Sequence, residues 1–181
     1  MPRKITRIAA AEVYNQPQLL HPNTLSNICA YIEKRNNGYV WDKTLENQAE
    51  KINEHLGYDS EGNWRCYTTE NGVAVINIDG ALTYKPTFWS ALCGGISYLD
   101  LQEAADSLAE DPSINTVVQI VDSGGGQAYG CFQTAQYFKD TIKGSGKRLI
   151  TYVDGMMASA AYALGCNADE VIMNPDAQAA A

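Results

Sequence analysis

Hydrophobic residues in the second half of the chain alternate between short β-branched runs and longer segments with helical spacing. Four runs are typical of buried strands: residues 73–79, 116–121, 149–153 and 170–173. Three segments carry apolar positions three or four residues apart, as helices do: residues 97–111, 127–142 and 157–166. Strands that alternate with helices predict an α/β domain with right-handed crossovers and a mostly parallel sheet.

Helix and turn signals sharpen these boundaries. Ser97 and Asp100 have the spacing of a capping box, so the first helix is expected to begin there and to end near Asp111. Glycines at 124–126 are expected to end the second strand in a tight turn, and Asp154 with Gly155 is expected to turn the third.

Residues 1–70 have a different texture, rich in asparagine, glutamine and glutamate, and they contain both histidines. Apolar spacing predicts short amphipathic helices over residues 25–32 and 43–56, followed by a loop or irregular hairpin over 57–72. The chain is therefore divided into a helical N-terminal arm, 1–70, and a core domain, 71–181.

Composition places the 181 residues among ordinary globular domains, since 45% are hydrophobic and 19% charged. The formal net charge of −8, with scattered basic residues, argues against nucleic acid as a ligand. Five cysteines without close spacing argue against a metal site and suggest reduced thiols in a cytosol. Cys131 and Cys166 are expected to be small buried side chains. No apolar stretch suits a signal peptide or a membrane span, so a cytoplasmic location without membrane contact is expected.

Two motifs have the residue types of an acyl-transfer site. The glycines at 124–126 follow a strand and can present backbone N–H groups to a developing oxyanion, whose loss costs on the order of 3 kcal/mol. Ser159 lies among small residues where a strand turns into a helix. Each motif also has a plain structural explanation: the glycines as a tight turn, the serine as a small side chain in a close-packed helix. Ser123 is a competing nucleophile, although a side-chain bond that fixes the glycine turn suits it better.

A general base for the serine is not evident. His21 and His55 lie in the arm, where surface or capping roles are expected. Solvated charge is the expected role of lysines 139, 143 and 147, near one helix end, and Lys85 is a weak candidate on a loop.

The combination of Asp122-Ser-Gly-Gly-Gly126 with Ala158-Ser-Ala-Ala-Tyr162 resembles the signal peptide peptidase A family of serine peptidases, over roughly residues 73–173. That resemblance implies a ClpP/crotonase-like fold and a Ser-Lys dyad. Ser159 would be the nucleophile, and the oxyanion hole would be formed by the N–H of Ala160 with that of Gly125 or Gly126. The dyad lysine would lie beyond residue 181, and Gly124 replaces the proline usual in that family.

The arm and the lack of a membrane anchor favour the phage branch of that family, head maturation proteases that cut scaffold and other capsid-assembly proteins. The resemblance implies no cofactor and a homo-oligomer, to which Tyr84, Phe88 and Trp89 would contribute an exposed segment. Two alternatives stay open. One is a crotonase-type enzyme that acts on an acyl thioester, which would need a surface for adenine. The other is a catalytically inactive structural or assembly domain of the same fold.

Overall fold

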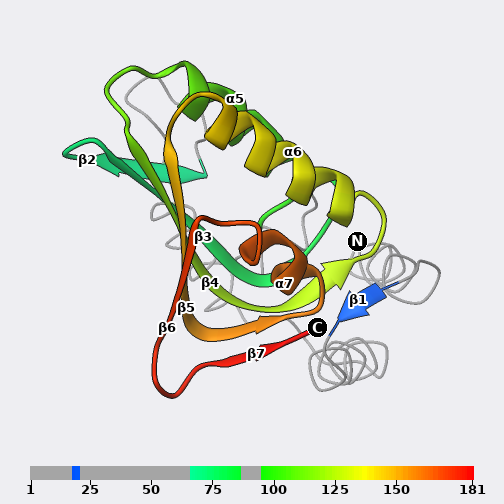
Figure 1. The fold of residues 1–181 in the computed structure, drawn as a ribbon. Helices are drawn as coiled ribbons and strands as arrows, with labels where there is room; N and C mark the ends of the chain where they lie inside the picture. The colour runs from blue at the N-terminus through cyan, green and yellow to red at the C-terminus, as the bar shows by residue number, and fades with distance from the viewer. Residues whose placement is uncertain (1–17, 21–65, 87–94) are drawn as a thin grey trace, which may run out of the picture.

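A computed structural model describes residues 18–20, 66–86 and 95–181 of the chain (Figure 1). The predicted helices over 25–32 and 43–56, both histidines, Phe88 and Trp89 lie outside the described residues. The elements follow in this order: β1 (Gln18–Leu20), β2 (Tyr67–Glu70), β3 (Val73–Leu82), α5 (Tyr98–Glu110), β4 (Thr116–Gln127), α6 (Cys131–Gly144), β5 (Arg148–Ala158), α7 (Ala160–Gly165), β6 (Glu170–Met173) and β7 (Gln178–Ala180). The described part of the expected helical arm thus includes a strand, β1.

The described strands form one sheet whose central order is β2-β3-β4-β5-β6. Neighbours from β3 to β6 run parallel, and β7 also pairs parallel with β5. Only β2 on β3 and β1 on β4 are antiparallel among the described pairs. The predicted α/β class with a mostly parallel sheet is confirmed.

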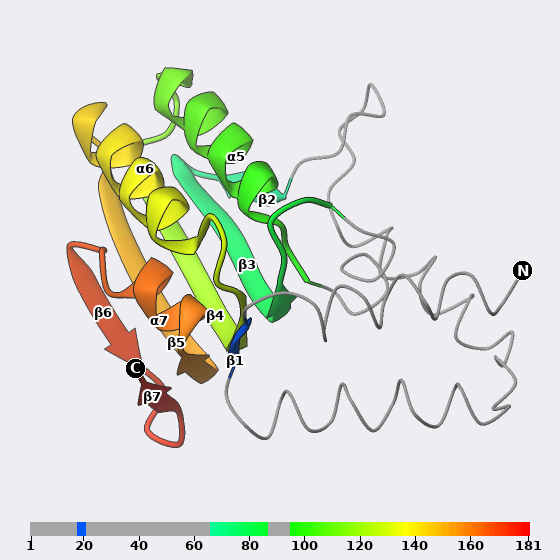
Figure 2. The same cartoon turned by 90° about the vertical axis from the view of Figure 1, so that its right-hand side faces the viewer.

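Helices α5, α6 and α7 lie together on one face of the sheet (Figure 2). Alternate strand residues turn toward them and are buried, including Ile76 on β3, Val117 and Val121 on β4, and Leu149 and Val153 on β5. Apolar side chains of the helices complete this core: Leu101, Ala105, Leu108, Ala135, Phe138 and Ile142. Burial of these two faces against each other supplies the main favourable free energy of the fold.

The predicted capping box at the start of α5 is confirmed. Ser97 is the N-cap, its Oγ accepts the N–H of Asp100 at 3.2 Å, and Asp100 Oδ2 accepts the N–H of Ser97 at 3.1 Å. Two otherwise unpaired N–H groups at the helix start are satisfied in this way.

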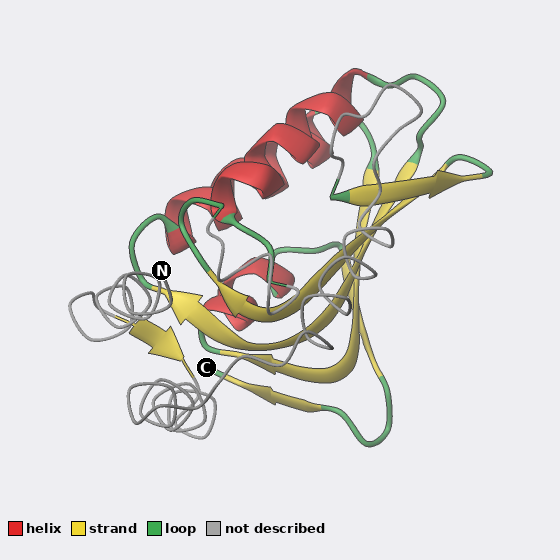
Figure 3. Cartoon of the chain, turned by 180° about the vertical axis from the view of Figure 1, so that it is seen from behind, coloured by secondary structure: helices red, strands yellow, loops and turns green. Residues whose placement is uncertain are grey.

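The strands are longer than the sequence pattern predicts, and this corrects the two expected turns (Figure 3). Gly124–Gly126 and the pair Asp154–Gly155 lie inside β4 and β5, while α6 begins at Cys131 and α7 at Ala160. The reason is pairing between distant segments. Beyond a register shift, Ala81 and Leu82 continue the ladder with Gly125 and Gly126, and β7 pairs with Met156–Ala158. Backbone partners thus keep extended segments whose residues favour turns.

Among the described helices, none combines the length and the apolar character needed to cross a bilayer.

Candidate functional site

The two motifs singled out in the sequence leave the sheet from neighbouring strands. Ser123 of β4 is the register partner of Met157 of β5, and after this pair the two strands separate. Gly125 and Gly126 follow on β4, and Ser159 follows on β5. Both motifs therefore stand at the carboxyl ends of adjacent parallel strands, where sites gather in such sheets.

Ser159 stands between β5 and α7 in a strained backbone conformation. Its φ of 56° and ψ of −116° lie outside the regions that side-chain-bearing residues ordinarily occupy. Its N–H donates to the carbonyl of Ala180 on β7 at 2.9 Å, and its carbonyl accepts the N–H of Ala163 at 3.1 Å. Ala160 is the first residue of α7, where N–H groups point away from the helix without intrahelical partners.

Replacing Ser159 with glycine is expected to stabilise the fold by about 1 kcal/mol, because glycine adopts this conformation without strain. Asn71 at φ 49° is a matched control, since asparagine tolerates a positive φ best among residues with side chains. Asn71→Gly should change the free energy of unfolding little. Urea titration of both variants measures the difference, and a destabilised Ser159→Gly chain would contradict the interpretation of strain.

Ser123 fixes the glycine run in the way that its sequence position suggests. Its Oγ, which is buried, donates to the carbonyl of Gly80 at 2.6 Å and accepts the N–H of Gly125 at 3.2 Å. This hydroxyl links the ends of β3 and β4, so the expected side-chain to backbone role is confirmed. The Gly125 N–H is consequently engaged within the chain.

Packing against the backbone of β3 requires glycine at position 126, whatever its role in a reaction. A Cβ added there would lie 2.6 Å from the Cα of Leu82 on β3 and closer still to its carbonyl oxygen. Gly125, in contrast, has a φ of 101°, which favours glycine through backbone angle. The structural explanation of the glycines therefore accounts for Gly126, while Gly125 sets the direction of the peptide groups beside Ser123.

Two side chains that the sequence pattern did not indicate, Tyr98 and Gln127, hold the end of β4. Tyr98 on α5 is fully buried and its hydroxyl donates to the Gln127 carbonyl at 2.6 Å. The Gln127 Oε1 accepts the N–H of Tyr84 at 2.6 Å, and the Tyr84 ring meets Tyr129 edge to face at 4.7 Å. Partners that lie 29 to 43 residues apart in the sequence leave no periodic signal.

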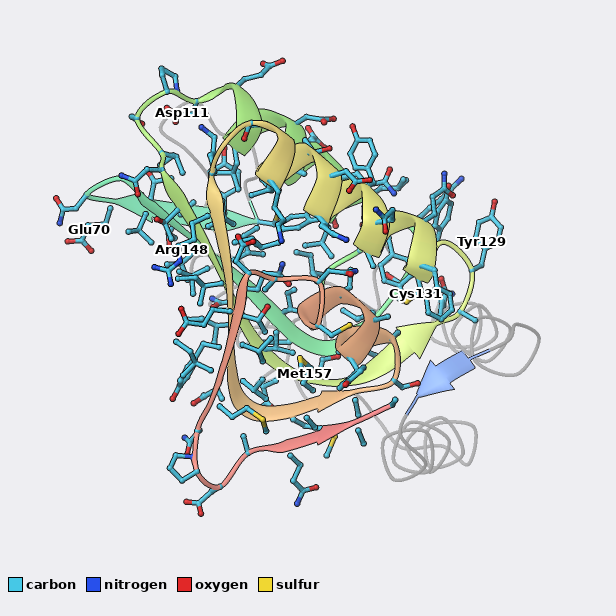
Figure 4. All side chains as sticks on the ribbon, in the orientation of Figure 1. Glu70, Asp111, Tyr129, Cys131, Arg148 and Met157 are labelled. Carbon is cyan, nitrogen blue, oxygen red and sulfur yellow. The ribbon has the colours of Figure 1, made fainter. Side chains whose placement is uncertain are left out.

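Cys131 connects the starts of α6 and α7. Its side chain is fully buried, Sγ lies 3.6 Å from the Ala160 carbonyl, and burial raises the pKa of its thiol (Figure 4). The expected burial of Cys131 is confirmed. Cys166, at the end of α7, is exposed, so the same expectation for that residue is wrong. Cys166 follows the last residue of α7, so it does not lie on the buried face of that helix.

Three aspartates line up where the parallel strands bend: Asp79, Asp122 and Asp154. Asp79 and Asp122 are register partners, and Asp122 Oδ1 accepts the N–H of Met156 at 2.9 Å. Burial raises the pKa of Asp79 above its ordinary value of 3.8, and the charges of Asp122 and Asp154 raise it further. No group of three or more potential ligands suited to a metal ion occurs within the described segments.

Asp79→Asn is expected to stabilise the fold at neutral pH by about 0.5 kcal/mol, because it removes a repelled, half-buried charge. A raised folded-state pKa means that protonation of Asp79 favours the fold below 3.8, and that this contribution is lost as the pH rises through the folded-state pKa. The advantage of the variant should therefore shrink on acidification. Thermal unfolding from pH 3 to pH 7 measures it, and a difference independent of pH would contradict the proposed repulsion.

Lysines near the start of β5 have structural roles. Lys143 pairs with Asp169 at 2.5 Å, and Lys147 Nζ donates to the carbonyls of Asp111 and Ile114 at 2.8 and 3.0 Å. These contacts lie at the amino ends of the parallel strands, opposite Ser159. The sequence predicts solvated charge for both lysines, whereas Lys147 is bonded to two backbone carbonyls and Lys143 to a carboxylate.

Comparison with known proteins finds similarity to solved structures only. No family model matches the sequence. No curated protein matches it either. Among solved structures, an enoyl-CoA hydratase from Mycobacterium avium subsp. paratuberculosis K-10 is 16% identical, with 62% of this chain and 45% of that chain covered and a TM-score of 0.49. One from Polaromonas sp. JS666 is 19% identical over 61% and 48%, with a TM-score of 0.45.

An enoyl-CoA hydratase/isomerase family member is 18% identical, with 62% and 48% of the two chains covered and a TM-score of 0.48. The chain spans about half the length of the solved structures that it matches. Likeness of this degree concerns the fold and assigns no activity.

The prediction of a Ser-Lys serine peptidase is wrong. The matched structures are described as enoyl-CoA hydratases or isomerases, not as peptidases, and they give no support to a phage maturation protease. In physical terms, a glycine strand and a small helix that begins at a strand end suit any chemistry at a carbonyl, so the two motifs do not by themselves select peptide hydrolysis. The chain has a mixed α/β fold with a mostly parallel sheet.

Proposed function

We propose that the chain carries a crotonase-type site that polarises the carbonyl group of an acyl thioester. The observation that carries the proposal is the register pair Ser123 and Met157, because it brings the glycine run and the strained Ser159 to the ends of neighbouring strands. Backbone strain of this kind is found most often at functional sites.

In this proposal the thioester oxygen accepts hydrogen bonds from the N–H of Ala160 and from that of Gly126, because the N–H of Gly125 already donates to Ser123 Oγ. Charge develops on that oxygen when water adds to the thioester or when a solvent water takes a proton from the neighbouring carbon. Fixed backbone donors stabilise that charge without reorganising, and each contributes about 3 kcal/mol. The Ser159 hydroxyl stands beside the reacting carbonyl and orients it.

Polarising a thioester carbonyl requires few groups besides the two backbone donors. A thioester carbonyl is less stabilised by resonance than an amide, so two donors already make its α-proton and its carbonyl carbon more reactive. The proposal therefore needs no pairing of Ser159 with a basic side chain.

Titration with acetyl-CoA, crotonyl-CoA and free coenzyme A tests the proposal. Saturable binding of the two thioesters, tighter than that of free coenzyme A, is expected. Hydration of crotonyl-CoA can be followed by the loss of its conjugated absorbance. Equal binding of free coenzyme A and thioesters would place the contacts outside the carbonyl site. No binding at all, either to the chain or to a variant in which β1 is released from β4, would overturn the proposal.

A second candidate, an assembly domain, is favoured by the outer strand β6. Val171, Ile172 and Met173 are 40 to 43% exposed, and β6 ends the described central strand order. Exposed apolar side chains on an edge strand invite pairing with another chain. Sedimentation should then show a homo-oligomer that Ile172→Lys dissociates, whereas a monomer at high concentration would rule this role out.

A further inference from the structure

The edge of β4 at the glycine run is occupied by a segment from the start of the chain. Gln18, Leu19 and Leu20 of β1 pair antiparallel with Gln127, Gly126 and Gly125, more than 100 residues away in the sequence. Figures 1 and 2 both show β1 at the tip of β4.

The position of β1 follows from the way the two central strands separate. Up to Ser123, β5 pairs with one edge of β4, while β3 pairs with the other edge as far as Gly126. β5 pairs with β4 no further than Met157, the partner of Ser123, while β7 pairs with the opposite edge of β5 at Met156–Ala158. β1 takes the edge that β5 has left, so it enters the angle between the glycine run and the chain that leads to Ser159.

The edge that β1 covers is made of backbone. Gly125 and Gly126 have no side chains, so recognition of a strand there depends on main-chain hydrogen bonds, and any extended segment with free N–H and C=O groups can compete for it. β1 is only three residues long, whereas β3, the neighbour on the other edge, is ten. So short a ladder can open while the rest of the sheet stays paired.

We propose that Gln18–Leu20 is a displaceable strap: an intramolecular strand that occupies an extended-polypeptide binding edge on Gly125–Gln127 and closes the neighbouring carbonyl site. The inference rests on the proposed function in one respect: the ligand that the strap excludes is the thioester of that proposal. The binding edge itself concerns a polypeptide in extended form and stands on the β1–β4 pairing.

The test compares Leu19→Pro with Leu19→Ala in the full chain. Proline removes the N–H of the central strap residue and disfavours strand pairing, while alanine keeps the backbone intact. Amide hydrogen exchange at the residue whose N–H faces β1, Gly126 or its neighbour Gln127, should become about tenfold faster in Leu19→Pro and stay unchanged in Leu19→Ala.

Binding of a synthetic peptide with the sequence of residues 15–22 gives the second readout. The peptide should bind Leu19→Pro and restore the protection of the amide that faces β1, but it should not bind the unaltered chain. Unchanged exchange in Leu19→Pro, or equal peptide binding to both chains, would overturn the strap. Unchanged protection of Val121, inside the parallel ladder, confirms that the variant is folded.

If Leu19→Pro does not fold, hydrogen exchange in the unaltered chain tests the strap instead. A displaceable strap requires the amide that faces β1 to exchange through a local opening, faster than Val121 and independently of low denaturant concentration. Equal protection of the two amides would overturn it. Where Leu19→Pro folds, binding of the peptide and of no thioester to that variant would refute the proposed function and leave the strap standing, so the two failures are distinguishable.

Discussion

Gly126→Ala is expected to destabilise the fold by about 3 kcal/mol or more. The added Cβ would fall 2.6 Å from the Leu82 Cα and nearer still to the Leu82 carbonyl oxygen. Both atoms belong to the backbone of β3, at the last position where it pairs with β4, and a backbone cannot rotate away as a side chain would. The two strands must separate locally or lose their last ladder positions. Urea denaturation followed by circular dichroism measures the loss.

Gly144→Ala is the matched control for this change. Gly144 is the last residue of α6, and a Cβ added there meets no atom within 4 Å. Alanine favours a helix over glycine by up to about 1 kcal/mol, so this variant should be slightly more stable than the parent chain. If Gly126→Ala proved as stable as Gly144→Ala, the close crossing of β3 and β4 would be refuted.

Gly125→Ala is expected to lower turnover of an acyl thioester by about 100-fold or more, which is the effect of removing one oxyanion donor. At a φ of 101° alanine is strained, and relief of that strain rotates the peptide groups on either side, including the N–H of Gly126. The donors would then no longer converge on one oxygen. Steady-state hydration of crotonyl-CoA measures the fall in kcat/KM.

Gly146→Ala separates the loss of a donor from simple backbone strain. Gly146 also has a positive φ, 81°, and its added Cβ meets nothing within 4 Å. It lies after α6, at the end of the domain opposite Ser159. Both variants should lose about 1 kcal/mol of stability, and only Gly125→Ala should lose turnover. Equal turnover in the two variants would count against the oxyanion role.

Much of the fold could be predicted because its signals are local. The capping box of Ser97 and Asp100, the β-branched strand runs and the apolar spacing of α5 and α6 involve neighbours within a few residues. The turns expected at Gly124–Gly126 and at Asp154–Gly155 were wrong, since the ladder partners that extend β4 and β5 lie far away in the sequence.

The candidate site divides in the same way. The role of Ser123 followed from its place before the glycines, and the structure confirms it. Tyr98, which holds the Gln127 carbonyl, and β1, which covers the glycine strand, could not be predicted, because both contacts depend on how the sheet brings distant segments together. The peptidase expectation was wrong because a glycine strand and a small-residue turn are compatible with several carbonyl chemistries.

Whether the glycine run, Ser159 and Ala160 act on one carbonyl is tested most directly by carbon-13 NMR of acetyl-CoA labelled at the thioester carbonyl. Hydrogen bonds from fixed backbone donors should move the bound carbonyl resonance downfield of the free one, and Gly125→Ala should abolish that shift while Gly146→Ala retains it. A bound resonance at the free position, or the same shift in both variants, would contradict a shared oxyanion site.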